Sequence, residues 1–264
     1  MKIKSLAFLW FTLFALGCSS DNDSTSTPAA NYFPLTTSNS WNYEVEGETT
    51  ETDVLLVGND ITINNLTYKQ MNTTNTPFGL YSTFLNNNGL RKENNKVMLS
   101  GAISFDLGLT DPFEFALNDF VLLKENAGTN ETLSTNSGTI NQELEGIPLI
   151  IDYTIKTTGL ESLPTFTTSR GIAYEDVKKV KFTISLKVVA SISTPGIPVP
   201  LNLTILNTQE VVSANQYYAK NIGMVYAENV ISYNLAIDPN EFDLPVPQTA
   251  TQTQKEFLTT FVVN

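Results

Sequence analysis

Two groups of closely spaced carboxylates are the residues of this sequence whose type and spacing best suit acid–base chemistry. Their members are Asp111, Glu114 and Asp119, and Asp238, Glu241 and Asp243. A pair of carboxylates can cleave glycosidic bonds when their separation suits a general acid and a base or nucleophile. Both groups follow proline-containing turns, where Asp is favoured because its side chain bonds nearby backbone groups. The sequence therefore predicts solvated turns at these places rather than a catalytic centre.

The second carboxylate group also offers hard oxygen ligands of the kind that bind calcium. It lacks the glycine and the closing acid of an EF-hand loop, so a turn is the simpler interpretation. The sequence contains no histidine, which excludes a Ser-His-Asp triad and the usual zinc sites. No Gly-x-Ser-x-Gly turn marks a serine as a nucleophile. We therefore expect no catalytic residue, no metal site and no cofactor, and we expect that the protein is not an enzyme.

Cys18 is the only cysteine of the chain, and a short leader precedes it. Lys2 and Lys4 are followed by the apolar stretch SLAFLWFTLFAL, whose length of about a dozen residues is too short for a membrane-spanning helix, which needs roughly 20. This arrangement is typical of a signal peptide, which we assign to residues 1–17. A lone cysteine in an exported protein has no intramolecular disulfide partner. We therefore expect the thiol of Cys18 to have a role other than an intramolecular disulfide.

The segment FALGC at residues 14–18 resembles the lipobox of bacterial lipoproteins, in which a small residue precedes the cysteine that is lipidated. Ala15 stands where that pattern favours leucine, and Leu16 where it favours a smaller residue. The resemblance implies acyl chains on Cys18 and anchoring in the outer membrane. Each buried methylene contributes about 0.8 kcal/mol, so two or more chains anchor a protein stably. The alternative is an ordinary secretory signal with a cysteine near the cleavage point.

Residues 19–30, SSDNDSTSTPAA, contain no large apolar side chain and cannot pack into a core. We therefore assign residues 18–30 to the lipidated cysteine and a flexible polar tether, with an end-to-end distance of about 20 Å. The acidic segment 20–23 resembles the export signal of Bacteroidota surface lipoproteins, and Asp23-Ser24-Thr25 resembles the O-glycosylation tripeptide of that phylum. These resemblances imply a cell-surface location and a glycan on Ser24. The plain alternative is a polar linker of ordinary composition.

The charge of the chain restricts its partners. Acidic residues outnumber basic residues by 27 to 15, and the formal net charge is −12. Such a surface repels phosphate backbones and anionic headgroups, which argues against nucleic acid and against adsorption to a membrane through a basic patch. We therefore expect the membrane to be a partner only through the covalent lipid on Cys18. Hydrophobic residues make up 41% of the chain, which is enough for a sizeable core.

Alternation of apolar and polar residues with a period of two dominates the sequence from residue 31 onward. The clearest case is 180–188, where parity places Phe182, Ile184 and Leu186 on one face and the polar residues between them on the other. We therefore predict a single all-β domain over residues 31–264. Its fold is an antiparallel, curved sheet, either half-barrel or sandwich-like, with one wet face and little helix. Residues 249–257 fit either a short helix or the approach to a final strand.

Local turn signals locate the expected reversals. Asn88-Gly89 predicts a tight hairpin between strands at 81–85 and 90–99, because both residues tolerate positive φ. Gly58-Asn59-Asp60 and Ser137-Gly138 predict two more reversals. The polar segment 126–136 is expected to be a loop near the middle of the domain, where a second subdomain would begin.

A second resemblance concerns the start of the folded part. The segment YFPL at residues 32–35, followed by Trp41 and Tyr43, is similar to the YFPL…W.Y opening of bacterial lipoproteins of unknown function. Residues 219–225 resemble the glycine-containing turn near the end of such domains. This family implies no activity. We expect Phe33 and Trp41 to close one end of the sheet.

Two function classes remain. The first is a non-catalytic surface lipoprotein that binds a protein or a glycan, which the negative charge and the polar loops favour. A glycan needs exposed aromatic rings, for which Tyr217, Tyr218 and Tyr226 are candidates, although tyrosines on alternating strands more often pack into the core. The alternative is a carrier of hydrophobic ligands such as lipids, whose curved sheet cradles acyl chains. Its lining would include Phe105, Leu107, Phe113, Phe115, Phe182 and Ile184.

Overall fold

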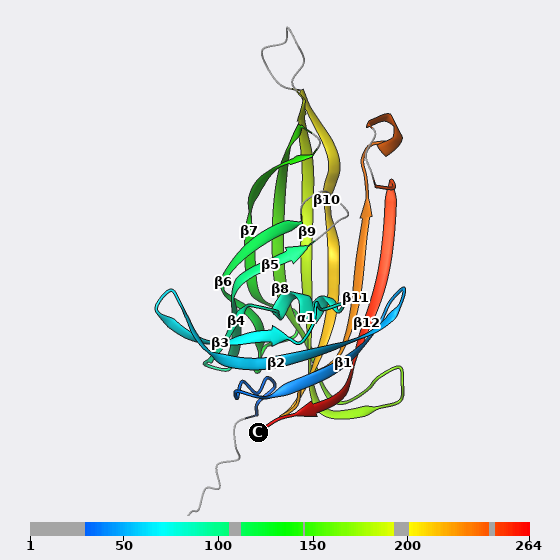
Figure 1. The fold of residues 1–264 in the computed structure, drawn as a ribbon. Helices are drawn as coiled ribbons and strands as arrows, with labels where there is room; N and C mark the ends of the chain where they lie inside the picture. The colour runs from blue at the N-terminus through cyan, green and yellow to red at the C-terminus, as the bar shows by residue number, and fades with distance from the viewer. Residues whose placement is uncertain (1–29, 106–111, 145, 193–200, 243–245) are drawn as a thin grey trace, which may run out of the picture.

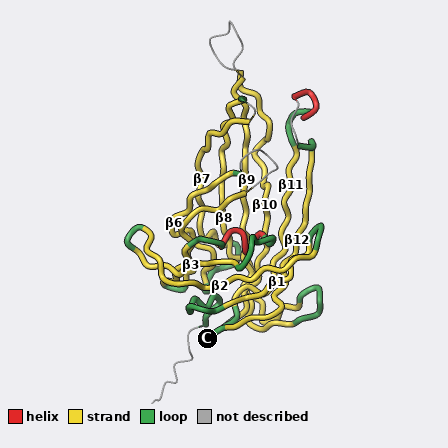
Figure 2. Tube along the Cα trace, in the orientation of Figure 1, coloured by secondary structure: helices red, strands yellow, loops and turns green. Residues whose placement is uncertain are grey.

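The computed structural model describes residues 30–105, 112–144, 146–192, 201–242 and 246–264. Strand covers most of this part of the chain (Figure 2). Its two helical segments are short: α1, Leu80–Leu85, and a single turn of 3-10 helix, η1, Pro239–Phe242. The strands are β1 Ser40–Glu46, β2 Thr50–Ile63, β3 Leu66–Thr73, β4 Gly89–Glu93, β5 Lys96–Phe105, β6 Phe113–Lys124, β7 Glu131–Leu144, β8 Ile147–Thr167, β9 Ala173–Ile192, β10 Leu201–Ala219, β11 Gly223–Asn234 and β12 Thr249–Val262.

All twelve strands belong to one antiparallel sheet in the order β6-β5-β4-β3-β2-β1-β12-β11-β10-β9-β8-β7. The first and last strands, β1 and β12, pair with each other and so join the two halves of the chain in the middle of the sheet. The sheet curls until its edge strands, β6 and β7, approach each other (Figure 1). Across this seam the side-chain Nδ2 of Asn136 donates to the backbone carbonyl oxygen of Ala116 at 2.9 Å. The prediction of an all-β, curved antiparallel sheet is confirmed, in barrel-like rather than sandwich form.

Strand length divides the sheet into a nearly closed lower part and an open upper part. Strands β8, β9 and β10 have 21, 20 and 19 residues, whereas β1, β3 and β4 have 7, 8 and 5. The long strands therefore continue as a tall curved wall above the short strands of the lower part (Figure 1). This upper wall presents its concave face without a complete ring of strands around it.

Two of the expected reversals are wrong. Gly58-Asn59-Asp60 lies within β2, at a shift in its register with β3, and Ser137-Gly138 lies within β7. The actual hairpin turns are Asn64-Asn65, with φ of 49° and 64°, and Asn94-Asn95, with φ of 50° and 63°. Asparagine tolerates the left-handed region, so Asn-Asn makes these turns without glycine. The polar loop is also shorter than expected, because β7 begins at Glu131, and it joins the two edge strands.

The segment expected as a strand before Asn88-Gly89 is instead the helix α1. Its buried side chains include Leu80, Tyr81, Phe84 and Leu85, a spacing that puts them on one side of a helix. An apolar run this short cannot be assigned by periodicity alone, which is why the strand prediction failed. For residues 249–257 the sequence fits either a helix or a strand. The structure shows a strand, because this segment lies within β12.

The lower end of the sheet is filled by aromatic side chains, as the sequence predicts for Phe33 and Trp41. Their rings meet edge to face with centroids 5.7 Å apart, and both side chains are buried. The indole nitrogen of Trp41 donates to the carbonyl oxygen of Ile222 at 2.6 Å. Gly223 has φ of 117°, and a Cβ there would lie 2.9 Å from the indole nitrogen, so only glycine fits. These contacts leave the upper end as the open one.

Side-chain parity on β9 makes a first prediction. Ile184 is fully buried on the inner face, whereas Ser185 is partly exposed on the outer face. We expect Ile184→Ala to lower the free energy of unfolding by about 2–5 kcal/mol, because it leaves a cavity among fixed neighbours. Ser185→Ala, the matched control, should change it by less than about 0.5 kcal/mol. Denaturant unfolding measures both; equal losses would mean that both faces are buried.

Candidate functional site

An apolar pocket lies on the concave face of the upper wall. It encloses about 780 Å³ of space free of protein atoms, a volume that includes the part open to solvent. The pocket is lined by Phe113, Leu144, Ile147, Leu149, Val188, Ala190, Ile192, Leu203, Ile205, Leu206, Tyr233, Leu235 and Val246.

The strand period and register place these side chains together. On β9, Val188, Ala190 and Ile192 are two residues apart, so all three project from the same face. Ala190 pairs with Leu149 on β8 and with Leu203 on β10, which puts a small side chain between two large ones. The hollow therefore follows from a row of side chains with its smallest member at the centre.

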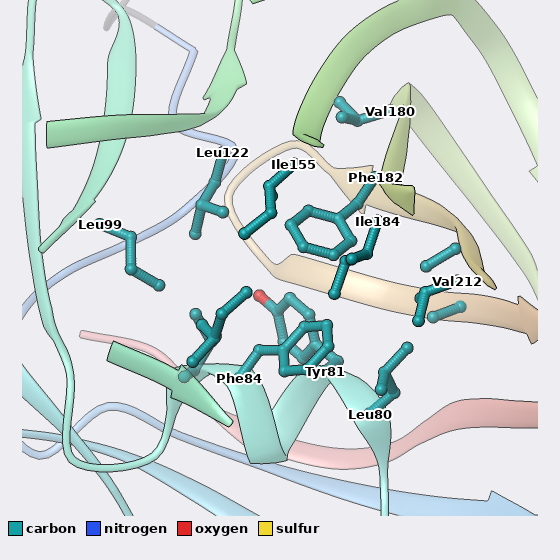
Figure 3. Packing of buried hydrophobic residues seen from close by; sticks show 14 of the residues in the cluster. Leu80, Tyr81, Phe84, Leu99, Leu122, Ile155, Val180, Phe182, Ile184 and Val212 are labelled. Carbon is teal, nitrogen blue, oxygen red and sulfur yellow. The ribbon is translucent and has the colours of Figure 1, made fainter. Parts of the chain in front are cut away.

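Nearer the lower end, outside the pocket, α1 and the side chains that pack on it fill the interior of the sheet. In Figure 3, Leu80, Tyr81 and Phe84 of α1 face the inner side chains of the sheet. The ring centroids of Phe84 and Phe182 lie 5.2 Å apart. Because α1 occupies the interior at this level, Phe182 and Ile184 are core residues that cannot contact a ligand in the pocket.

The side chains expected to line a ligand cavity coincide with the lining of this pocket only in part. Phe113 lines the pocket, whereas Phe105, Phe115, Phe182 and Ile184 are buried core residues outside it. Leu107 lies outside the described residues. The lining residues that the sequence analysis missed belong to the same alternating strands, farther toward the open end.

Three side chains of the sheet hold α1 in place at its start. The backbone N–H groups of residues 78–81 donate to Asp53 of β2 and to Gln254 and Glu256 of β12, at 2.7–2.9 Å. The first N–H groups of a helix have no partner within the helix, so side chains from elsewhere must satisfy them. The sheet thereby fixes both the position and the direction of the short helix.

Glu256 is an uncommon member of this clamp because its carboxyl group is fully buried. Its Oε1 accepts from Tyr81 N and from the amide nitrogen of Asn229 at 2.8 Å, while no described residue bonds its Oε2. This Oε2 and Asp53 Oδ2 both crowd the Cα of Gly79, where a side chain would collide with them. Burial raises the pKa of Glu256 to about 7, and the nearby charge of Asp53 also raises it. Glu256 therefore keeps its proton well above the usual range for a glutamate.

The raised pKa of Glu256 predicts how stability depends on pH. In the unfolded chain this carboxyl group ionises near 4.5, whereas the folded protein holds its proton to about 7. The stability that protonated Glu256 contributes is therefore complete below pH 4.5 and is lost as the pH rises to 7. The free energy of unfolding changes by about 3 kcal/mol over this range. Glu256→Gln keeps the shape of the side chain but cannot ionise. The unfolding free energy of this variant should therefore not fall between pH 4.5 and 7.

Denaturant unfolding at pH 4.5, 5.5, 6.5 and 7.5 measures the free energy of unfolding of the unaltered protein and of Glu256→Gln. The effects of the other carboxylates cancel in the difference between the two proteins. Glu228→Gln, which removes an exposed carboxylate of the neighbouring strand β11, is the control for loss of one charge. A constant difference between the unaltered protein and Glu256→Gln over this range would show that buried Glu256 is ionised throughout.

Asp119 and Glu114, the described members of the first carboxylate group, have separate surroundings. Asp119 is held by two bonds of 2.7 Å from the guanidinium of Arg91 and one of 2.6 Å from the Tyr68 hydroxyl. The Arg91 bonds lower the pKa of Asp119, and the Tyr68 bond adds to this. Glu114 is exposed on β6, and Asp111 lies outside the described residues.

The second group forms a turn, as expected. Asp238 accepts from the backbone N–H of Asn240 at 3.0 Å, and Glu241 lies in η1. Asp243 lies outside the described residues. Within the described ranges, no three His, Cys, Asp or Glu residues gather in a group that could hold a metal ion.

The three candidate tyrosines for glycan stacking are core residues. Tyr217, Tyr218 and Tyr226 are 8%, 0% and 6% exposed. The ring of Tyr217 stacks on that of Phe166 with centroids 4.0 Å apart and an interplanar angle of 16°. Their rings are therefore covered by other side chains and offer no face to a sugar.

The residues predicted to carry modifications, Cys18 and Ser24, lie outside the described residues. In the part of the chain that the structure covers, no helix is long and apolar enough to cross a membrane. No protein-family model matches the chain, and neither the curated proteins nor the solved structures contain a significant match to it.

Proposed function

We propose that this protein is a non-catalytic envelope lipoprotein, anchored in the outer membrane through Cys18 and exposed at the cell surface, that binds a hydrophobic ligand in the apolar pocket. The observation that carries the proposal is a hollow on the concave face of the upper wall that is lined by apolar side chains. Protein cores are filled to the density of organic crystals. Apolar surface left in contact with water forgoes about 25 cal/mol per Å². A ligand that covers this wall recovers that free energy.

The contrast between the two halves of the sheet supports a ligand rather than an incomplete core. In the lower half the chain supplies its own filling, since α1 and the aromatic cluster around Trp41 occupy the interior. In the upper half the same alternation continues, but Ala190 opens the centre of the row between Leu149 and Leu203. Stacking of a glycan on Tyr217, Tyr218 or Tyr226 has no comparable support, since these three tyrosines are buried.

The position of the pocket relative to the start of the folded chain agrees with anchoring through residues 18–30. The carbonyl oxygen of Asn31 accepts from the backbone N–H of Asn221, in the turn between β10 and β11 at the lower end. From the level of this turn, where Val177 pairs with Ala219, β9 runs about 40 Å to Ala190 at roughly 3.3 Å per residue. An anchor on Cys18 would thus hold the lower end near the membrane and leave the pocket free to exchange ligand.

Titration with the neutral fluorescent probe N-phenyl-1-naphthylamine tests the proposal. The protein is the full mature chain with Cys18→Ser, so that no acyl chain attached to the protein competes with the probe. We expect saturable binding of one probe per chain, with the blue-shifted emission of an apolar site. Emission that rises linearly with probe, as for a protein without a site, would contradict the proposal.

A further inference from the structure

The chemistry of the pocket wall indicates which part of a ligand enters it. None of the lining residues is charged, and the hydroxyl of Tyr233 is the only polar side-chain atom among them. A polar group that enters such a site loses its water without gaining a hydrogen bond, which is unfavourable. The buried part of the ligand is therefore hydrocarbon, and its polar end stays at the mouth.

Negatively charged side chains lie near the ends of the strands that line the pocket. Glu114 follows Phe113, Glu143 precedes Leu144, and Asp238 and Glu241 lie between Leu235 and Val246, and all four are exposed.

One basic residue stands at this level of the wall. Lys187 of β9 lies beside Val188 and directly opposite Asp152 of β8, so a carboxylate accompanies it. Asp152 is exposed and Lys187 is partly exposed. Five described carboxylates thus stand against one amine at the upper end. The field at the mouth is negative, and it acts over the Debye length, about 30 Å at 10 mM salt and 8 Å at 150 mM.

From this arrangement we propose that the pocket selects lipids whose headgroup carries no net negative charge. The proposal rests on the proposed function and adds the ligand class to it. A hydrocarbon chain gains the same burial whatever its headgroup, so the carboxylates decide between headgroups. An anionic headgroup at the mouth is repelled, a neutral one is not, and a cationic one is attracted.

Three amphiphiles of one chain length test the charge preference: dodecanol, dodecanoate and dodecyltrimethylammonium. Each displaces N-phenyl-1-naphthylamine from the mature Cys18→Ser chain at pH 8. At 10 mM salt we expect dodecanoate to displace the probe about three- to tenfold less effectively than dodecanol, with dodecyltrimethylammonium at least equal to dodecanol. At 500 mM salt the three should agree within about 1.5-fold, because the charges are screened.

Removing the carboxylates checks their role. The combined variant Glu143→Gln, Asp238→Asn, Glu241→Gln should narrow the low-salt gap between dodecanol and dodecanoate. A matched variant that removes three exposed carboxylates away from the pocket strand ends should keep it: Glu48→Gln, Glu175→Gln, Glu228→Gln. Dodecanoate that binds as well as dodecanol at 10 mM salt, or a gap that the first variant leaves unchanged, overturns the charge preference alone. Failure of all three amphiphiles to displace the probe, or of the probe to bind, overturns the proposed function itself.

Discussion

Ala190→Phe should lower the affinity of the pocket for N-phenyl-1-naphthylamine by at least about 30-fold. Ala190 is the smallest side chain of the row that it forms with Leu149 and Leu203. A phenyl ring at this position projects into the hollow and occupies the space that the probe needs. The loss follows from volume alone, because the substitution changes neither charge nor hydrogen bonding. The measurement is the fluorescence titration described above for the mature Cys18→Ser chain.

Val189→Phe is the matched control for this variant. Val189 is the preceding residue of β9 and points to the outer face, since successive side chains of a strand alternate. Val189→Phe introduces the same ring on the same strand but on the outer face. The affinity of this variant for the probe should therefore stay within about twofold of the affinity of the Cys18→Ser chain. Thermal unfolding of both variants shows whether each is folded; Ala190→Leu, with a smaller side chain, replaces Ala190→Phe if overpacking unfolds it. Full probe binding by a folded Ala190→Phe would place the binding site elsewhere.

Cys18→Ser should move the protein completely from the membrane pellet to the soluble fraction and abolish its labelling by a palmitate analogue. Two acyl chains with about 0.8 kcal/mol per buried methylene anchor a protein stably on a membrane. The acidic chain, with a net charge of −12, has no compensating attraction to anionic headgroups. Fractionation of cells that express either form measures the change.

The control for this experiment is Ser20→Ala, which alters the adjacent tether and keeps the cysteine. It should remain in the pellet and take up the label. Retention of Cys18→Ser in the pellet after a wash in high salt would contradict anchoring through this residue and require another membrane attachment.

The sequence was sufficient to predict the strand class and the orientation of side chains, because a half-buried strand has a period of two. On β9 this parity correctly placed Phe182, Ile184 and Leu186 inside. Two features were beyond it. The run at 80–85 is too short for its period to distinguish helix from strand, and its conformation depends on Asp53 and Glu256 of distant strands. The hairpin turns also use Asn-Asn, which signals a turn more weakly than Asn-Gly.

The pocket was beyond sequence analysis for a related reason. Ile184 and Ala190 share the same face of the same strand, so parity cannot tell which of them is covered by another element. Only the position of α1 decides that Ile184 is core and that Ala190 faces a hollow. Glu256 is similar, since it lies in a polar stretch of sequence and is buried because α1 begins above it.

Native mass spectrometry of the protein, purified without denaturant from a bacterial envelope as the Cys18→Ser form, tests most directly whether the pocket holds a hydrophobic ligand. The predicted result is a second species, heavier than the polypeptide by the mass of one lipid without net negative charge, which disappears in Ala190→Phe and persists in Val189→Phe. The contradicting result is the polypeptide mass alone, in a folded protein that also gives no saturable signal with N-phenyl-1-naphthylamine.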